Sequence, residues 1–138
     1  MQTNYLAFCL TLSIGFWSCQ QSPKVVTPQY NESSEIFFQQ LRSVGHFNNI
    51  NIAHSYSQTD SDIHGVQLEI KLIDGLIRSY SGESLDSLAS VVARIARNNI
   101  TNWKTFDRVT IRFATSNGEP VSNASNKTVY VFRPAKEN

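Results

Sequence analysis

One amphipathic segment, residues 84–100, constrains the fold more than any other feature of this chain. Its sequence is SLDSLASVVARIARNNI, and its apolar side chains recur with the 3.6-residue period of an α-helix. Ser84 is expected to be the N-cap, and Arg94 and Arg97 lie toward the negative end of the helix dipole. The segment predicts a helix that packs on a core through one face, formed by Leu85, Leu88, Ala89, Val92, Ile95 and Ala96.

The composition limits the chemistry that the chain can carry. Its 138 residues suit one ordinary domain, and a formal net charge of +1 gives no indication of binding to nucleic acid or to an acidic membrane surface. Both cysteines, Cys9 and Cys19, lie within the first twenty residues. Because no cysteine follows position 19, the rest of the chain cannot form an internal disulfide, a cysteine nucleophile or a thiolate metal site.

An apolar run near the start of the chain, YLAFCLTLSIGFW at residues 5–17, precedes the polar stretch SCQQS. The run is too short to span a bilayer as a stable helix and is typical of an export signal. Its end, FWSC, resembles the lipobox of bacterial lipoproteins, in which a cysteine after a small residue is diacylated and becomes the mature N-terminus. The resemblance covers only the first twenty or so residues and implies that Cys19 carries acyl chains such as palmitate. Cleavage after Gly15, which would release a soluble protein with a free Cys19, and an uncleaved anchor are the alternatives.

The same resemblance indicates a location and a domain organisation. Because Gln20 and not aspartate follows Cys19, the protein resembles lipoproteins that are anchored in the outer membrane and face the periplasm. We expect a signal peptide at 1–18, a lipidated cysteine with a tether at 19–31, and a single domain at 32–138. The tether contains two prolines and shows no periodicity, as an extended linker does.

The other elements follow from periodicity and turn signals. A shorter helix is expected at 33–44, ending at Gly45, with Ile36, Phe37, Leu41 and Val44 on its inner face. Alternating residues predict strands at 49–56, 66–73 and 106–115, the first two joined by a hairpin loop at 57–65. The apolar segment 128–133 predicts a last strand, and a short strand at 76–80 is left open. We expect a two-layer α+β fold with the helices on one face of an antiparallel sheet of four or five strands.

The predicted hairpin is the first candidate for chemistry. Residues 54–64, HSYSQTDSDIH, contain His54, Asp62 and His64, which are side chains of the types that bind zinc. Their spacing matches no metal motif, and the same residues are common in a plain polar turn. We therefore assign no metal and keep these three residues as weak candidate ligands.

The sheet face opposite the helices is the second candidate. Arg108 and Arg112 are expected to point outward there, and Tyr130 and Phe132 join them if the last strand has the right parity. Exposed aromatic side chains beside arginines are typical of a binding surface. The parity is open, because Val129 and Val131 fit the outer face equally well.

Motifs of enzymes are not found in the sequence. There is no G-x-S-x-G, S-x-x-K or H-E-x-x-H motif, and no glycine-rich loop follows a predicted strand. We expect a lipid-anchored periplasmic binding or accessory module for an envelope partner, with no catalytic residue and no cofactor. The alternatives are a hydrolase-like or metal-dependent enzyme that uses the hairpin at 54–64 and a structural subunit of an envelope complex.

Overall fold

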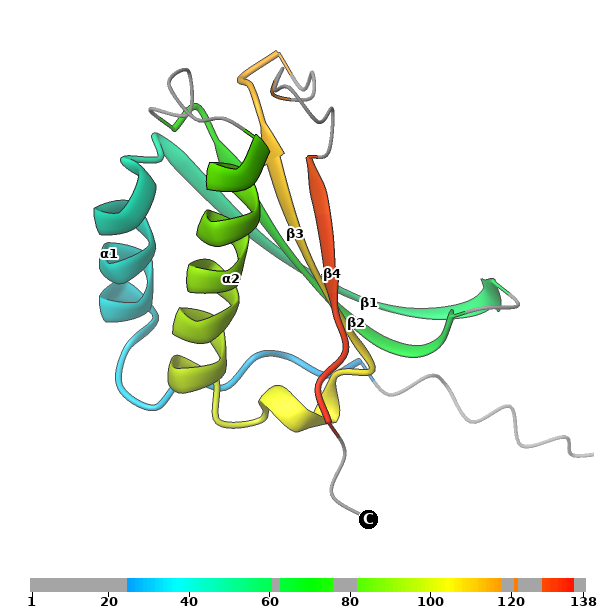
Figure 1. Cartoon of the computed structure of the whole chain (residues 1–138). Coiled ribbons are helices and arrows are strands. Elements are labelled where there is room, and N and C mark those ends of the chain that lie inside the picture. Colours follow the sequence, from blue (N-terminus) through cyan, green and yellow to red (C-terminus); the bar gives the residue numbers. More distant parts are fainter. Residues whose placement is uncertain (1–24, 61–62, 76–81, 118–120, 122–127, 136–138) are drawn as a thin grey trace, which may run out of the picture.

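The computed structural model describes residues 25–60, 63–75, 82–117, 121 and 128–135. Within these residues, four strands form one sheet in the order β1-β2-β3-β4, and both helices lie on the same side of it (Figure 1). In chain order the elements are α1 (Ser34–Gly45), β1 (Asn49–Asp60), β2 (Ile63–Ile73), α2 (Gly82–Asn99), the short 3-10 helix η2 (Trp103–Thr105), β3 (Arg108–Ala114) and β4 (Val129–Phe132).

The sheet is mixed, and the expectation of an antiparallel sheet is wrong. β1 pairs with β2 and β3 with β4 in antiparallel fashion, but β2 and β3 run parallel from Gln67 paired with Arg108 to Ile73 paired with Ala114. The reason is α2, which lies between β2 and β3 in the chain. Its 18 residues are about 27 Å long, enough to return the chain to the end of the sheet where β2 began.

The two helices agree with the predicted periodicity in most positions. In α2, Leu85, Ala89, Val92 and Ala96 are fully buried. The helix begins at Gly82, so Ser84 lies inside its first turn and is not the N-cap.

In α1 the predicted limits are close to the observed ones. The Ser33 hydroxyl accepts a hydrogen bond from the backbone N–H of Ile36 at 3.3 Å, and His46 ends the helix in the left-handed conformation, with φ of 48°. Phe37 and Leu41 are buried as predicted. Ile36 is 36% exposed, so its assignment to the inner face is wrong.

The β1–β2 hairpin is longer than predicted. β1 continues to Asp60 and β2 starts at Ile63, so strand replaces most of the expected loop at 57–65. In Figure 1 the end of this hairpin projects beyond the other strands as an arm. The two-residue period marks a strand with one buried face, and residues 57–65, SQTDSDIHG, show no alternation of apolar and polar residues, so the pattern did not predict the extension.

The end of β2 meets the end of β3 at Asp74, a residue with φ of 53°. Its backbone N–H donates to the Ala114 carbonyl at 3.1 Å, and its Oδ1 accepts from the Ser116 N–H at 2.6 Å. Asp74 therefore joins the two parallel strands. The strand considered at 76–80 lies outside the described residues.

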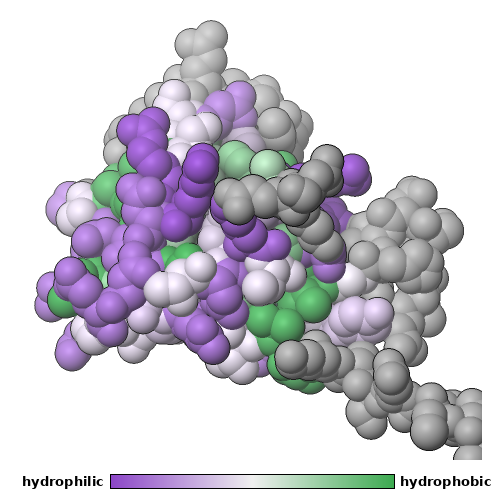
Figure 2. All heavy atoms as spheres, turned by 90° about the horizontal axis from the view of Figure 1, so that it is seen from below, coloured by the Kyte–Doolittle hydropathy of each residue, from purple (hydrophilic) through white to green (hydrophobic). Residues whose placement is uncertain are grey.

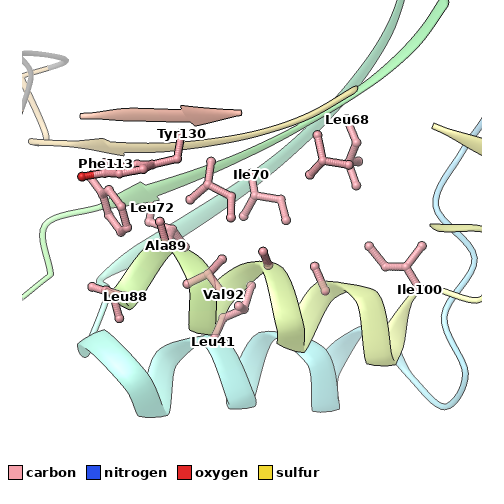
Figure 3. Close-up of a cluster of buried hydrophobic side chains, with 14 of the residues drawn as sticks. Leu41, Leu68, Ile70, Leu72, Leu88, Ala89, Val92, Ile100, Phe113 and Tyr130 are labelled. Atoms are coloured by element: carbon pink, nitrogen blue, oxygen red, sulfur yellow. The ribbon is translucent and has the colours of Figure 1, made fainter. Parts of the chain in front are cut away.

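The core lies between the sheet and α2, as Figure 3 shows. Fully buried side chains of two strands point to this side: Leu68, Ile70 and Leu72 from β2, and Val109, Ile111 and Phe113 from β3. The Phe113 ring meets the ring of Tyr130 edge-on, with centroids 5.8 Å apart. This core leaves the end of α2, η2 and the residues after β4 to form the edge of the domain.

Candidate functional site

A pocket of about 590 Å³, named here the basic groove, opens between α2, η2 and the chain that follows β4. α2 contributes its last turns, η2 contributes the two residues at its start, and the end of β4 closes the far side. The lining residues are Ser90, Ala93, Arg94, Arg97, Trp103, Lys104, Phe132, Arg133, Pro134 and Ala135.

Positive charge dominates the rim of the groove. Arg94 and Arg97 are three residues apart on α2 and therefore lie side by side on the helix surface. Lys104 from η2 and Arg133 from the chain after β4 add two further cations, and the lining contains no Asp or Glu. Within the described part of the chain, no ion pair or hydrogen bond is found for the side chains of the three arginines. The groove therefore presents guanidinium groups that are available to an anionic ligand.

The floor of the groove is apolar. Trp103 is only 8% exposed and belongs to the hydrophobic core, and Phe132 packs against the same core from β4. Ala93 and Pro134 complete this surface. Guanidinium groups above aromatic and aliphatic side chains suit a ligand with an anionic group and an apolar part, since arginine binds oxyanions with two parallel hydrogen bonds.

The residues that precede α1 are held beside this groove. The Asn102 side chain accepts from the Gln29 N–H at 2.8 Å and donates to the Thr27 carbonyl at 2.9 Å. The Thr101 N–H also donates to the Gln29 carbonyl at 2.8 Å. Residues 25–31 were expected to be part of the free tether. They lie instead against the domain, next to Thr101 and Asn102, the two residues that precede Trp103 in the chain.

The open sheet face carries the two predicted arginines. Arg108 and Arg112 border a shallow hollow of about 190 Å³, together with Ala53, Ser55, Gln67, Leu68, Glu69, Thr110 and Val129. Arg112 Nε donates to Glu69 Oε1 at 2.6 Å, in a pair exposed enough to stabilise the fold only slightly. Arg108 Nε is buried, and no described residue forms a hydrogen bond with it.

Tyr130 and Phe132 do not lie on the open face, so the expected cluster of aromatics with Arg108 and Arg112 is wrong. Tyr130 pairs with Ile111, and Phe132 pairs with Val109, and directly paired residues point to the same side of a sheet. Since Ile111 and Val109 face the core, the two aromatics do too. Val131 points outward instead and is 45% exposed.

Tyr130 is buried near the N-terminal end of α2. Burial first, and then its hydrogen bond to the Asp86 carboxylate and the negative charge of that group, raise the pKa of Tyr130 to about 12. All three effects favour the protonated phenol. Tyr130 therefore acts as a neutral hydrogen-bond donor within the core.

Only one of the three candidate metal ligands in the hairpin is among the described side chains. His54 is exposed on β1, while Asp62 and the side chain of His64 lie outside the described residues. Among the side chains that are described, no group of three or more His, Cys, Asp or Glu is close enough to bind a metal.

Sequence patterns did not predict the basic groove, although Phe132 was among the candidates. Its basic side chains come from positions 94 to 133. Because they are so far apart in the chain, no local sequence pattern indicates that they lie together. A partial signal was present in Arg94 and Arg97 at the end of a helix, followed by the dipeptide Trp103-Lys104.

Comparisons with known proteins assign no function to this site. No protein-family model matches the chain, and neither the curated proteins nor the solved structures contain a significant match. In the described part of the chain, neither helix is both long and apolar enough to cross a membrane.

Proposed function

We propose that this protein is a lipid-anchored module of the cell envelope that binds an anionic ligand in the basic groove and does not catalyse a reaction. We further propose that the domain has two layers, the helices and the sheet, with the groove at one end. The observation that carries the proposal is the lining itself: four basic side chains, and no acidic one, surround an aromatic floor.

The anchor rests on the residues at the start of the chain. The apolar run at 5–17 followed by Cys19 supports an export signal and a lipid on that cysteine. The membrane is then the first partner of the protein, at the periplasmic side of the outer membrane, and a second envelope protein is a further partner. The net charge of +1 supports no nucleic-acid partner.

The lining favours binding over catalysis. General acid–base chemistry needs a titratable group within hydrogen-bond reach of the reacting atom; the groove residues include no His, Asp or Glu, which leaves Lys104 as the one side chain of the usual acid–base types. Ser90 is the one hydroxyl among them, and it donates to the Asp86 backbone carbonyl at 3.0 Å. The groove thus offers charge and shape without an activated nucleophile.

The open sheet face supports a second binding function, with an acidic protein partner. The supporting observation is the buried Arg108 Nε, for which the described residues provide no acceptor. The Nε atom itself is closed to a partner, but a carboxylate in the hollow that Arg108 and Arg112 border would pair with their guanidinium groups. Retention of an envelope protein by the wild-type chain but not by Arg108→Gln, in a cross-linking experiment, tests this function.

The fluorescence of Trp103 tests the main proposal. The chain has two tryptophans, and Trp17 lies in the predicted signal peptide, so in a chain that starts at position 19 only Trp103 contributes. All described elements lie between residues 25 and 135, and this chain retains them. With Cys19→Ser to avoid oxidation, we expect pyrophosphate and hexyl phosphate to change the emission of Trp103 in a saturable manner.

Two variants locate the binding. Arg97→Gln should weaken the affinity for hexyl phosphate at least about tenfold, the loss expected for a hydrogen bond between charged groups. Arg42→Gln removes a charge from exposed α1, away from the groove, and should leave the affinity unchanged. If neither anion changes the emission, or if both variants bind equally well, the groove is not an anion site.

A further inference from the structure

We infer that the ligand of the basic groove is the phosphate headgroup of a membrane lipid, and that the groove end of the domain faces the membrane to which Cys19 is attached. This inference rests on the proposed function and names the ligand class of the same site. Its chemistry is a phosphate ester joined to an apolar body, which a soluble phosphate would share only in part.

The first support is the place where the N-terminal segment leaves the domain. Hydrogen bonds from Thr101 and Asn102 hold residues 27–29 next to η2, which provides Trp103 and Lys104 to the groove. In Figure 1 the end of α2, η2 and the chain after β4 all lie at this same lower end of the molecule. The attachment point and the groove therefore share one end of the fold.

The second support is the small number of residues between Cys19 and the part of the chain that packs on the domain. Val26, which packs against the core, lies seven positions after Cys19, so an extended chain between them spans at most about 25 Å. A domain of about 100 residues has a radius of gyration of about 13 Å, so its far end is farther from Cys19 than this chain reaches. A lipid on Cys19 thus favours orientations in which the groove end is nearest to the bilayer.

The third support is the surface of that end. Figure 2, which views the molecule from below Figure 1, shows hydrophilic residues over most of this face, with hydrophobic areas among them that are most extended at the lower right. Val25 is 61% exposed, and the basic groove brings Arg94, Arg97, Lys104 and Arg133 together above Trp103. Basic side chains at this end attract the anionic headgroups of a membrane.

Binding to vesicles tests the inference. The probe is the chain that starts at position 19 with Cys19→Ser, so that no covalent lipid contributes, mixed with vesicles of phosphatidylcholine alone or with added phosphatidylglycerol. We expect binding only to vesicles that contain phosphatidylglycerol. Replacing Arg94 and Arg97 by Gln should weaken this binding about fivefold for each residue, because one basic side chain near an anionic membrane contributes about that factor.

A charge-matched control separates the groove from the net charge. Arg42→Gln with Lys71→Gln also removes two positive charges, but neither residue lines the groove, and this pair should keep most of the binding. An equal loss in both pairs would overturn the inference, because net charge alone would then explain the attraction.

The soluble anions distinguish the inference from the proposed function. If the chain binds no phosphatidylglycerol vesicles but hexyl phosphate still changes Trp103 emission in an Arg97-dependent manner, the ligand is soluble: the lipid inference fails and the proposed function stands. If vesicles and soluble anions both fail to bind, both proposals fail. Vesicle binding with quenching of Trp103 by lipids that are brominated near the headgroup supports both.

Discussion

The substitution Gly65→Ala should destabilise the domain strongly, because it disturbs the point where the hairpin arm leaves the sheet. Gly65 has φ of +136°, a conformation that residues with a side chain rarely adopt. Alanine there is expected to store about 1–3 kcal/mol of backbone strain. Its Cβ would also lie 1.9 Å from Oδ2 of Asp107, so the carboxylate would have to move.

Moving Asp107 has its own energetic consequence. Its Oδ2 accepts from the Val66 N–H at 2.7 Å, and its backbone N–H donates to the Val66 carbonyl at 2.8 Å, so Asp107 holds β2 at the start of β3. Losing the hydrogen bond to the carboxylate costs about 1.5–3 kcal/mol. Together with the strain, Gly65→Ala should lower the free energy of unfolding by about 2.5–6 kcal/mol.

A double-mutant cycle in urea, followed by Trp103 fluorescence, measures the two contributions separately. In an Asp107→Ala background the hydrogen bond is already absent, so Gly65→Ala should cost only the strain, and the coupling should be about 1.5–3 kcal/mol. Asp74→Ala is the matched control, because Asp74 also accepts a backbone N–H but lies at the other end of β2, and its effect should add to that of Gly65→Ala. Additivity between Gly65 and Asp107 would refute the clash, and a loss within about 0.5 kcal/mol for Gly65→Ala would refute the strain as well.

Three further predictions concern other parts of the fold. The pKa of Tyr130 is raised from 10.0 to about 12, so the protonated phenol stabilises the fold fully below pH 10 and this contribution is lost as the pH rises toward 12. Tyr130→Phe should therefore flatten the unfolding free energy against pH in that window, and an unchanged pH dependence would contradict the role of burial and Asp86. Phe113→Ala removes a fully buried ring and should cost about 3–5 kcal/mol in urea unfolding, whereas a loss below about 1 kcal/mol would mean that this core collapses around the gap. Asn102→Ala removes both side-chain hydrogen bonds to residues 27 and 29 and should cost about 1–2 kcal/mol. It should also speed amide hydrogen exchange at Gln29. Unchanged protection of that amide would show that the Asn102 side chain does not hold residues 27–29 on the domain.

Elements with a clear period were predicted well. Leu85, Ala89 and Val92 repeat with a helical period, and all three are buried in α2. Val109 and Ile111 alternate along β3 and face the core in the same way. These predictions hold because one wet face and one dry face leave a pattern in the local sequence.

The last strand shows where this reasoning ends. The segment 128–133 is apolar at alternate positions on both sides, so its sequence does not specify which face is buried. Pairing with Ile111 turns Tyr130 toward the core and leaves Val131 outside. Because of this pairing, Tyr130 and Phe132 face the core and are not part of the expected binding surface. Arg108 and Arg112 lie on the open face as expected.

The sequence by itself thus determined which faces of α2, β2 and β3 are buried, the α+β class, and the residues from which an export signal and a lipid on Cys19 are predicted. Only the tertiary structure decided that β2 and β3 run parallel, that Tyr130 lies in the core, and that Arg94, Trp103 and Arg133 meet in one groove. The physical reason is the range of the interactions. Burial of one face is recorded in residues a few positions apart, whereas strand direction and the lining of a groove depend on contacts between segments that are distant in the chain.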